Sequence, residues 1–325
     1  MDATETKTFA RKTYIDTLKF FSIFIVYLTH FIDYWNNSYF KFWTEKPSSF
    51  LLYGISGKLG VAFFSVCVGY FAFLSKHKNP LVYMIRRYFY FFLCGFIINT
   101  IFAFGNHDIS IKILTEAVKL GAEYFPAYWC MFSFFLASIV SYFNSYYKAS
   151  LSFIILEIII FGIIGYIWVS ICLLGNITIL ILNNEKFMQY FQCKRNKIFL
   201  LVLCFFLIKR DESNMTYFID GICSCIILCV VENSAQLKKI LSCKLFLPGK
   251  NVMPIYLFHT FIFIKMGKYL FASFSDMPYS HAFLLTFILC WIVLLVISFP
   301  VDFVLQSIMK KVSQIINNFI SDEMS

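Results

Sequence analysis

The sequence predicts an all-α fold, a polytopic membrane bundle of about ten transmembrane helices, from its composition and hydropathy. Hydrophobic residues fill 60% of the 325 positions and charged residues only 14%, against about 25% in soluble domains. The mean hydropathy of the chain is +0.73. The 42 Phe and 20 Tyr residues suit lipid-facing surfaces and interfacial aromatic belts better than a soluble core. Composition therefore excludes a water-soluble fold.

Apolar runs between charged breaks predict where the helices lie. The run 151–182 fits either one long tilted helix or two short helices that turn near Gly162, Gly165 or Gly175. The run 197–208 is short, because two cations follow it directly. The ten predicted spans are 15–32, 50–74, 82–104, 124–143, 151–167, 168–182, 197–208, 215–231, 252–272 and 282–305.

The basic residues favour an even number of spans, with both termini in the cytoplasm. With ten spans and an inner N-terminus, the inner segments hold 19 of the 28 Lys and Arg residues, as the positive-inside rule requires. No small-residue cleavage pattern follows the first apolar run, so we expect a retained helix and not a signal peptide. This topology predicts a cytoplasmic segment 1–14, a membrane domain 15–309 and a cytoplasmic tail 310–325.

The charge and the cysteines narrow the expected partners. The net charge of +10 does not indicate nucleic acid, because the cations are spread over successive inner loops without a basic repeat or a stacking motif. Anionic membrane lipids and an anionic soluble substrate are the expected partners. Most of the 11 cysteines lie in apolar spans and behave as small hydrophobes, and no pair has zinc-ligand spacing with histidine. We therefore expect neither a metal site nor a disulfide framework.

The first predicted helix carries the most informative pattern. The run Asp16–Asp33 holds a cation, Lys19, and an imidazole, His30, which an α-helix places on one face roughly 16 Å apart. Asp33, one turn after His30, can hold one ring nitrogen as a donor and leave the other basic, as a general base requires. The alternative is an interfacial histidine near the lipid headgroups.

Three cations are candidates to bind a phosphorylated substrate from the cytoplasm. Lys19 lies near the inner end of its helix, and Arg86 and Arg87 open the third span on the same side. Together they can converge on the phosphates of one cytoplasmic cofactor. The simpler interpretations are that Lys19 snorkels to lipid phosphates and that the arginines only obey the positive-inside rule.

Other residues in the spans are further candidates. Gly69, in the run GVAFFSVCVGYF, allows a helix or a ligand to approach the backbone closely. His259, in MPIYLFH, lies at a depth where a polar side chain is costly unless it faces protein or water. The carboxylates Glu157 and Asp220 each need a partner or water, and Trp129 is most simply an interfacial anchor. The histidines in predicted loops, where solvent satisfies them, are His77, His107 and His281.

In these motifs the chain resembles the acyltransferase 3 family, integral membrane acyltransferases that modify bacterial surface glycans. The first helix of that family shows Asp, two residues, Arg or Lys, ten residues and then His, and Asp16, Lys19 and His30 fit this pattern. The second helix shows Gly-Val, a Phe-rich stretch and then Ser-Gly-Tyr or Ser-Gly-Phe, which is similar to the run that ends at Gly69 and Tyr70. The resemblance extends from residue 11 to about residue 305.

Later motifs extend the resemblance, with some departures. Arg86 and Arg87 resemble the paired arginines of the family, YWCMF around Trp129 resembles its fourth-helix motif, and IYLFH at 255–259 resembles its late Tyr-Leu-x-His element. The departures are Val68, where the family has serine, and Ala127 and Tyr128, where a histidine often precedes the tryptophan.

The resemblance implies a membrane O-acyltransferase in the bacterial cytoplasmic membrane. It would move an acyl group, most often acetyl, from cytoplasmic acyl-CoA to a sugar hydroxyl of a lipid-linked or cell-surface glycan, without a metal. His30 and Asp33 would then be catalytic, either directly or through an acyl-histidine. The residues expected to bind the acyl-CoA donor are Lys19, Arg86, Arg87, Gly69 and Tyr70.

Two other functions compete with this one. A transporter or flippase would use the same buried histidines, carboxylates and inner cations, and it would need no bound coenzyme A. A glycan polymerase or lipid-linked glycosyltransferase ranks last, because such enzymes commonly display long extracytoplasmic loops with charged clusters, which this chain lacks.

Overall fold

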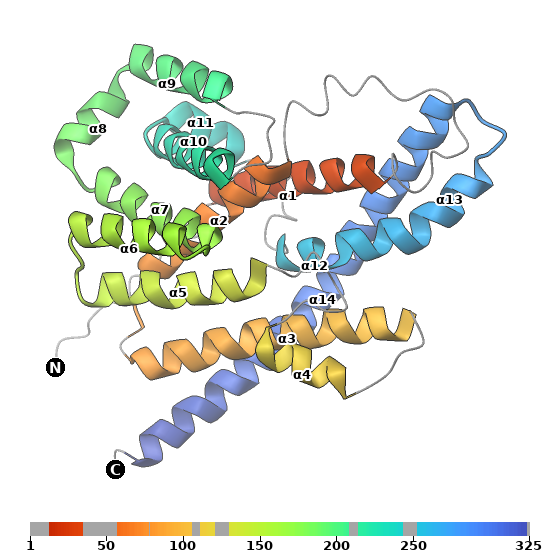
Figure 1. Cartoon of the computed structure of the whole chain (residues 1–325), viewed down its shortest axis with the longest axis horizontal. Helices are drawn as coiled ribbons and strands as arrows, with labels where there is room; N and C mark the ends of the chain where they lie inside the picture. The colour runs from red at the N-terminus through yellow and green to blue at the C-terminus, as the bar shows by residue number, and fades with distance from the viewer. Residues whose placement is uncertain are drawn as a thin grey trace.

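The computed structural model describes residues 13–34, 57–77, 79–105, 111–120, 130–207, 214–242 and 252–323 (Figure 1). Every regular element within these ranges is a helix, so the all-α prediction is confirmed there. The helices are α1 (Thr13–Tyr34), α2 (Gly57–Phe73), α3 (Pro80–Gly105), α4 (Lys112–Lys119), α5 (Met131–Tyr146), α6 (Leu151–Ile163), α7 (Ile167–Leu182), α8 (Glu185–Gln192), α9 (Lys194–Leu207), α10 (Asn214–Glu232), α11 (Ala235–Leu241), α12 (Val252–Ile262), the π-helical turn η5 (Phe263–Gly267), α13 (Lys268–Ser273) and α14 (Tyr279–Glu323).

A helix occupies the described part of each predicted span, and the run 151–182 forms two helices, α6 and α7. The chain turns at Gly165, whose φ of 90° is a left-handed conformation that glycine adopts without steric cost. The amide of Tyr166 donates to the carbonyl of Phe161 at 2.8 Å. The hydroxyl of Ser170 donates to the backbone carbonyl of α6 at Ile158, also at 2.8 Å, so α7 folds back onto α6.

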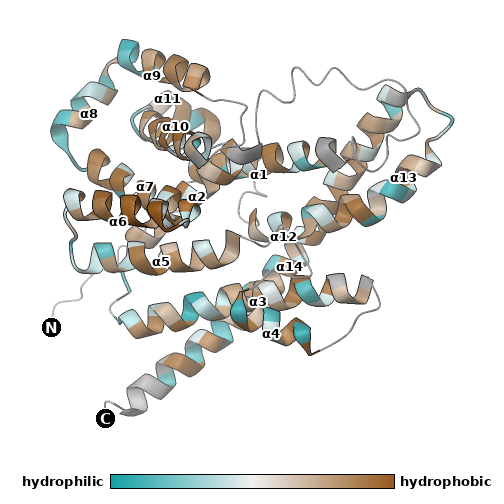
Figure 2. Cartoon of the chain, in the orientation of Figure 1, coloured by the Kyte–Doolittle hydropathy of each residue, from teal (hydrophilic) through white to brown (hydrophobic). Residues whose placement is uncertain are grey.

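Among the described residues, fewer helices than the ten predicted spans are long and apolar enough to cross a membrane by themselves. Within the described residues, three segments qualify, and a fourth arises if α7 and α8, bent by 89° at their junction, form one span. Two other apolar helices, α2 and α6, are too short to qualify, since α6, for example, has only 13 residues. Figure 2 shows that apolar residues dominate α6 and α7, while α8 is mostly polar. The qualifying segments are Pro80–Ile101, Met215–Glu232 and Ser280–Ile316.

Three short helices, α4, α8 and α11, lie where the sequence predicted only connections. Side chains cap two of them: Asn184 accepts from the amides of Lys186 and Phe187 at the start of α8, and Ser234 accepts from the amide of Leu237 at the start of α11. The last helix is also longer than predicted, because α14 continues to Glu323 through most of the expected tail 310–325.

Helix α2 lies among α1, α5, α7 and α10, and its glycines let two of these neighbours approach closely (Figure 1). A Cβ atom on Gly69 would lie 1.8 Å from the carbonyl oxygen of Cys172 in α7, and Gly175 of α7 meets α2 in the same way. A Cβ atom on Gly60 would lie 2.4 Å from the carbonyl oxygen of Ser22 in α1. Because only glycine fits these crossings, α2 fixes the position of α1, the helix that carries Lys19 and His30.

Candidate functional site

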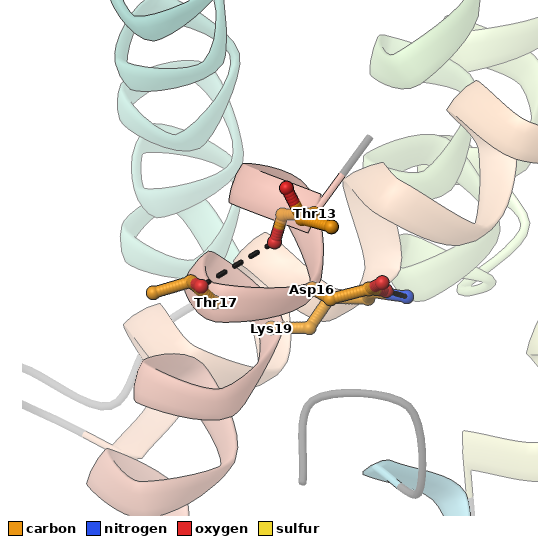
Figure 3. Close-up of polar contacts among 4 residues, drawn as sticks. All are labelled: Thr13, Asp16, Thr17 and Lys19. Carbon is orange, nitrogen blue, oxygen red and sulfur yellow. Dashed lines mark hydrogen bonds and ion pairs between the residues drawn. The ribbon is translucent and has the colours of Figure 1, made fainter. Parts of the chain in front are cut away.

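The first turns of α1 present a charged pair to one side of the helix. Lys19 Nζ lies 2.7 Å from Asp16 Oδ1 and 5.2 Å from the centroid of the Phe71 ring on α2. Figure 3 shows Asp16 and Lys19 together on one side, while Thr17 points the other way. The Thr17 hydroxyl donates to the backbone carbonyl of Leu241, the last residue of α11, so α11 holds the first turns of α1 from the opposite side. Lys19 is thereby held with its ammonium group facing α2.

Lys19 lines a cavity of about 200 Å³, which we call the inner cavity. Five helices contribute to its wall: α1 with Lys19, α2 with Phe71, α3 with Arg87, α5 with Ser138 and α12 with Met253. Lys19 and Arg87 are separated by 68 residues in the sequence, yet both cations face this one space. The inner cavity is therefore suited to an anionic group.

A second cavity of about 230 Å³, the outer cavity, is lined by Arg86, Arg87, His77, Tyr90 and Gln306 of α14. Arg87 and Tyr90 line both spaces, so the two cavities adjoin. All three cations expected from the sequence thus line one pair of linked cavities.

The arginines are held in place by neighbouring groups. The Nε of Arg87 donates to the Tyr83 hydroxyl at 3.1 Å, and its guanidinium carbon lies 5.3 Å from the centre of the same ring. The Nη2 of Arg86 donates to the carbonyl of Ser313 on α14 at 3.5 Å. Planar guanidinium groups positioned in this way can bind phosphate through paired hydrogen bonds.

His77 joins this site from the turn between α2 and α3, although the sequence gave no reason to choose it. Burial, followed by the positive charges of Arg86 and Arg87, lowers the pKa of the His77 imidazole below its usual value. The ring is therefore neutral at pH 7 and can donate or accept a hydrogen bond there.

At the far end of α1, the structure brings His30 beside His259 of α12. The two ring centroids are 5.3 Å apart, and the planes are tilted by 52°. His30 is exposed, whereas His259 is completely buried. The sequence singled out both histidines, but their contact spans 229 residues, so that no local spacing could reveal it.

The hydrogen bonds of His259 define its tautomer. Its Nδ1 pairs with the carbonyl oxygen of Tyr256, and since a carbonyl only accepts, Nδ1 carries the proton. Its Nε2 then accepts from the Thr260 hydroxyl at 3.1 Å. Both nitrogens of His259 are thus engaged, which leaves the exposed His30 as the imidazole of the pair that is placed to meet a substrate.

Aromatic rings separate the inner cavity from the histidines. Phe64, which lines the inner cavity, stacks on Tyr256 with centroids 6.3 Å apart and planes at 6°. The space that Phe64 and Tyr256 line with Ile23 and Val26 measures about 10 Å³, barely the volume that one water needs. The Tyr256 hydroxyl also lies 2.9 Å from the Sγ of Cys130. The stack thus lies between the inner cavity and His259, whose ring centroid is 5.6 Å from that of Tyr256.

Gly69 and Tyr70 contact other helices in the structure. Gly69 packs against the α7 backbone, as described above, and the Tyr70 hydroxyl donates to Oε1 of Glu232 at 3.0 Å. The other carboxylate oxygen of Glu232 accepts from the Tyr14 hydroxyl of α1 at 2.7 Å. Glu232, at the end of α10, therefore connects α1 to α2. The sequence pattern around Glu232 gave no sign of this role. That Gly69 and Tyr70 bind the acyl-CoA donor stays a prediction.

The remaining candidates lie apart from this arrangement or outside the described region. Asp220 is completely buried in α10, and Glu157 of α6 accepts a hydrogen bond from the side-chain amide of Asn144 at 2.6 Å. The side chain of Asp33 and the whole of Trp129 lie outside the described residues. In the described part of the chain, no group of three or more His, Cys, Asp and Glu side chains could hold a metal ion.

No family model, no curated protein and no solved structure matches the chain. The arrangement of its own residues is therefore the basis for a functional assignment.

Proposed function

We propose that this protein is a membrane O-acyltransferase of the acyltransferase 3 type. It would transfer an acyl group, acetyl in the first instance, from cytoplasmic acyl-CoA to a sugar hydroxyl of a lipid-linked or cell-surface glycan. The observation that carries the proposal is that the two ends of α1 hold different functional groups. One unbroken helix holds Lys19 in a cation-lined cavity and, roughly 16 Å farther along, His30 beside a second histidine.

The cations account for donor binding in this proposal. Coenzyme A carries several phosphates at one end and its thioester at the other, joined by an extended pantetheine arm. Lys19, Arg86 and Arg87 line two adjoining cavities, so they can hold the phosphates while the arm follows α1 toward His30.

The histidine pair accounts for the chemistry. His30 would accept the proton of the acceptor hydroxyl as its oxygen attacks the thioester carbonyl, and the coenzyme A thiolate would leave. In the other route, a ring nitrogen of His30 attacks the thioester carbonyl and the coenzyme A thiolate leaves. The acceptor hydroxyl oxygen then attacks the acyl-histidine, and its proton passes to the departing imidazole. In both routes His259 acts by holding the His30 ring in place. The stack of Phe64 on Tyr256 must part for the arm to pass, so we expect donor binding to move these two rings.

We further propose that the ten predicted spans cross the bacterial cytoplasmic membrane with both termini inside. The composition of the two cavities supports this topology. Their walls come from the start of α1, the end of α2, the start of α3 and the start of α12, which the ten-span topology places on the cytoplasmic side. A donor arriving from the cytoplasm would meet this end first.

The experiment that tests the function uses purified full-length protein in lipid nanodiscs with radiolabelled acetyl-CoA. We expect saturable donor binding and transfer of label to an added bacterial glycan extract. A protein that is folded but neither binds nor consumes acetyl-CoA would contradict the proposal. Movement of a glycan precursor across proteoliposomes without acyl transfer would support a transporter or flippase instead.

A further inference from the structure

A separate cavity of about 540 Å³ lies where α5 ends and α6 begins, and it shares no lining residue with the two cation-lined cavities. Asn144 and Tyr147 line it from the end of α5, and Phe153 and Glu157 line it from α6. The acyl-transfer proposal makes no use of this space. Its lining combines one carboxylate with several aromatic rings.

Among the described residues, the carboxylate of Glu157 accepts a hydrogen bond and forms no ion pair. Asn144, whose side chain is buried, donates its amide to Oε2 of Glu157 at 2.6 Å. The ion pairs within the described residues are elsewhere, between Asp16 and Lys19 and between Glu116 and Lys119. A carboxylate in an apolar helix is costly unless a partner compensates its charge. The site is therefore suited to a cationic ligand.

The aromatic rings specify the kind of cation. Phe143 and Tyr147 lie nearly parallel, at 9°, with centroids 5.9 Å apart, and Phe153 faces the same cavity from α6. Aromatic faces attract organic ammonium groups, including quaternary ones, and one carboxylate adds the opposite charge. A bare metal ion would need more ligands than the single carboxylate of this cavity supplies.

The surroundings indicate that the ammonium group belongs to a lipid. Phe153 and Leu156 on α6 are half exposed, at 50% and 51%, so the helix presents an apolar face beside the cavity. The lining runs from Ala149, in the loop before α6, to Glu157, eight residues or about 12 Å along the chain axis. That depth matches a headgroup that enters from the membrane interface. Lys148, exposed in the same loop, is available for the phosphate of a zwitterionic headgroup.

We propose that this cavity binds the ammonium headgroup of a zwitterionic phospholipid, with Glu157 as its counter-ion and Tyr147 as its aromatic wall. The site would tie the protein to its lipid environment independently of acyl transfer. Phosphatidylethanolamine and phosphatidylcholine both carry the required group, whereas phosphatidylglycerol does not.

The test is native mass spectrometry of the full-length protein, released from mixed vesicles of phosphatidylethanolamine and phosphatidylglycerol. Wild type should retain phosphatidylethanolamine in preference, and Glu157→Gln should retain on the order of tenfold less, as expected for the loss of a charged partner. Glu185→Gln removes an exposed carboxylate in α8 and should change nothing. Equal retention by wild type and Glu157→Gln would overturn the proposal.

Tyr147 provides a second variant, because its side chain is 71% exposed and its replacement leaves the helix packing intact. Tyr147→Ala should lower retention several-fold, and Tyr147→Phe should restore it, since the ring and not the hydroxyl is required. Unchanged retention in Tyr147→Ala would contradict the aromatic site. Free ethanolamine should compete only weakly, and competition as strong as that of the lipid would contradict a lipid source.

Discussion

The two ends of α1 differ in construction although they belong to one helix. Around Lys19, segments distant in the sequence converge, cations face open space, and the linked cavities measure about 200 and 230 Å³. At the other end, the described residues place the His30 ring beside His259, and the stacked rings of Phe64 and Tyr256 lie between the two ends. In the proposed function, the Lys19 end would bind the large, charged donor, and the His30 end would hold the reactive imidazole. The difference suggests that binding and chemistry can be separated by mutation.

The largest effect is expected from displacing α2, because α2 fixes the position of α1 and so of both the Lys19 end and the His30 end. Gly69→Ala should destabilise the fold by more than about 3 kcal/mol, because the new Cβ would lie 1.8 Å from the Cys172 carbonyl oxygen. Gly162→Ala is the matched control, since its Cβ would meet Ser170 Oγ at an ordinary 3.7 Å. Thermal unfolding of both variants in detergent measures the effect. Equal stability of the two would contradict the close crossing of α2 and α7.

A charge reversal at Lys19 should weaken donor binding at the Lys19 end of α1, the proposed binding end, and leave the His30 end unchanged. Lys19→Glu should raise the KM for acetyl-CoA on the order of hundredfold, because it repels the donor phosphates and adds a second negative charge beside Asp16. Lys19→Arg should stay within a few-fold of wild type, since arginine also binds phosphate. Lys186→Glu, at an exposed position on α8, serves as the control. A neutral Lys19→Glu would mean that Lys19 only anchors the helix to lipid.

The two arginines sharpen the comparison within the binding end. Arg87 lines both cavities and Arg86 only the outer one, so Arg87→Ala should raise the donor KM about tenfold and Arg86→Ala about threefold. Steady-state kinetics with acetyl-CoA gives both values. The reverse order would show that the donor phosphates lie outside the inner cavity.

The smallest predicted effect is a dependence of donor affinity on pH. The pKa of His77 in the free protein lies below its usual value, because of burial and the nearby Arg86 and Arg87. A bound phosphate favours the protonated ring, so binding takes up a proton, and donor affinity should rise a few-fold as the pH falls through the range in which the His77 imidazole titrates. Titration of donor binding against pH measures this rise. It should be absent in His77→Gln, and a rise of equal size in that variant would assign it to another group.

Much of the fold was predictable, because apolar runs and glycines act locally. The helices coincide with the apolar runs, and the break near Gly165 follows from a backbone conformation that favours glycine. The short helices α4, α8 and α11 were missed because they are too brief for a periodic pattern to distinguish them from loops. The count of membrane-crossing helices was predicted from runs alone, although only three helices, or four with the bent pair, qualify by themselves in the described residues.

The site was predictable in its parts and not in its contacts. Lys19 and His30 share one helix, so their spacing already indicates a common face. The contact of His30 with His259 and the bridge from Glu232 to Tyr14 and Tyr70 join remote segments, and only tertiary packing creates them. His77 was set aside as a loop residue because its sequence neighbours do not reveal the cavity that it lines.

The most direct test of the central claim compares acyl transfer and donor binding in His30→Ala. Transfer of label from acetyl-CoA to glycan should fall by about a hundredfold or more, as expected for the loss of a general base, while donor binding stays within a few-fold of wild type. His281→Ala, at an exposed position on α14, should retain both properties. Full transfer activity in folded His30→Ala protein would contradict the assignment of chemistry to the histidine end of α1.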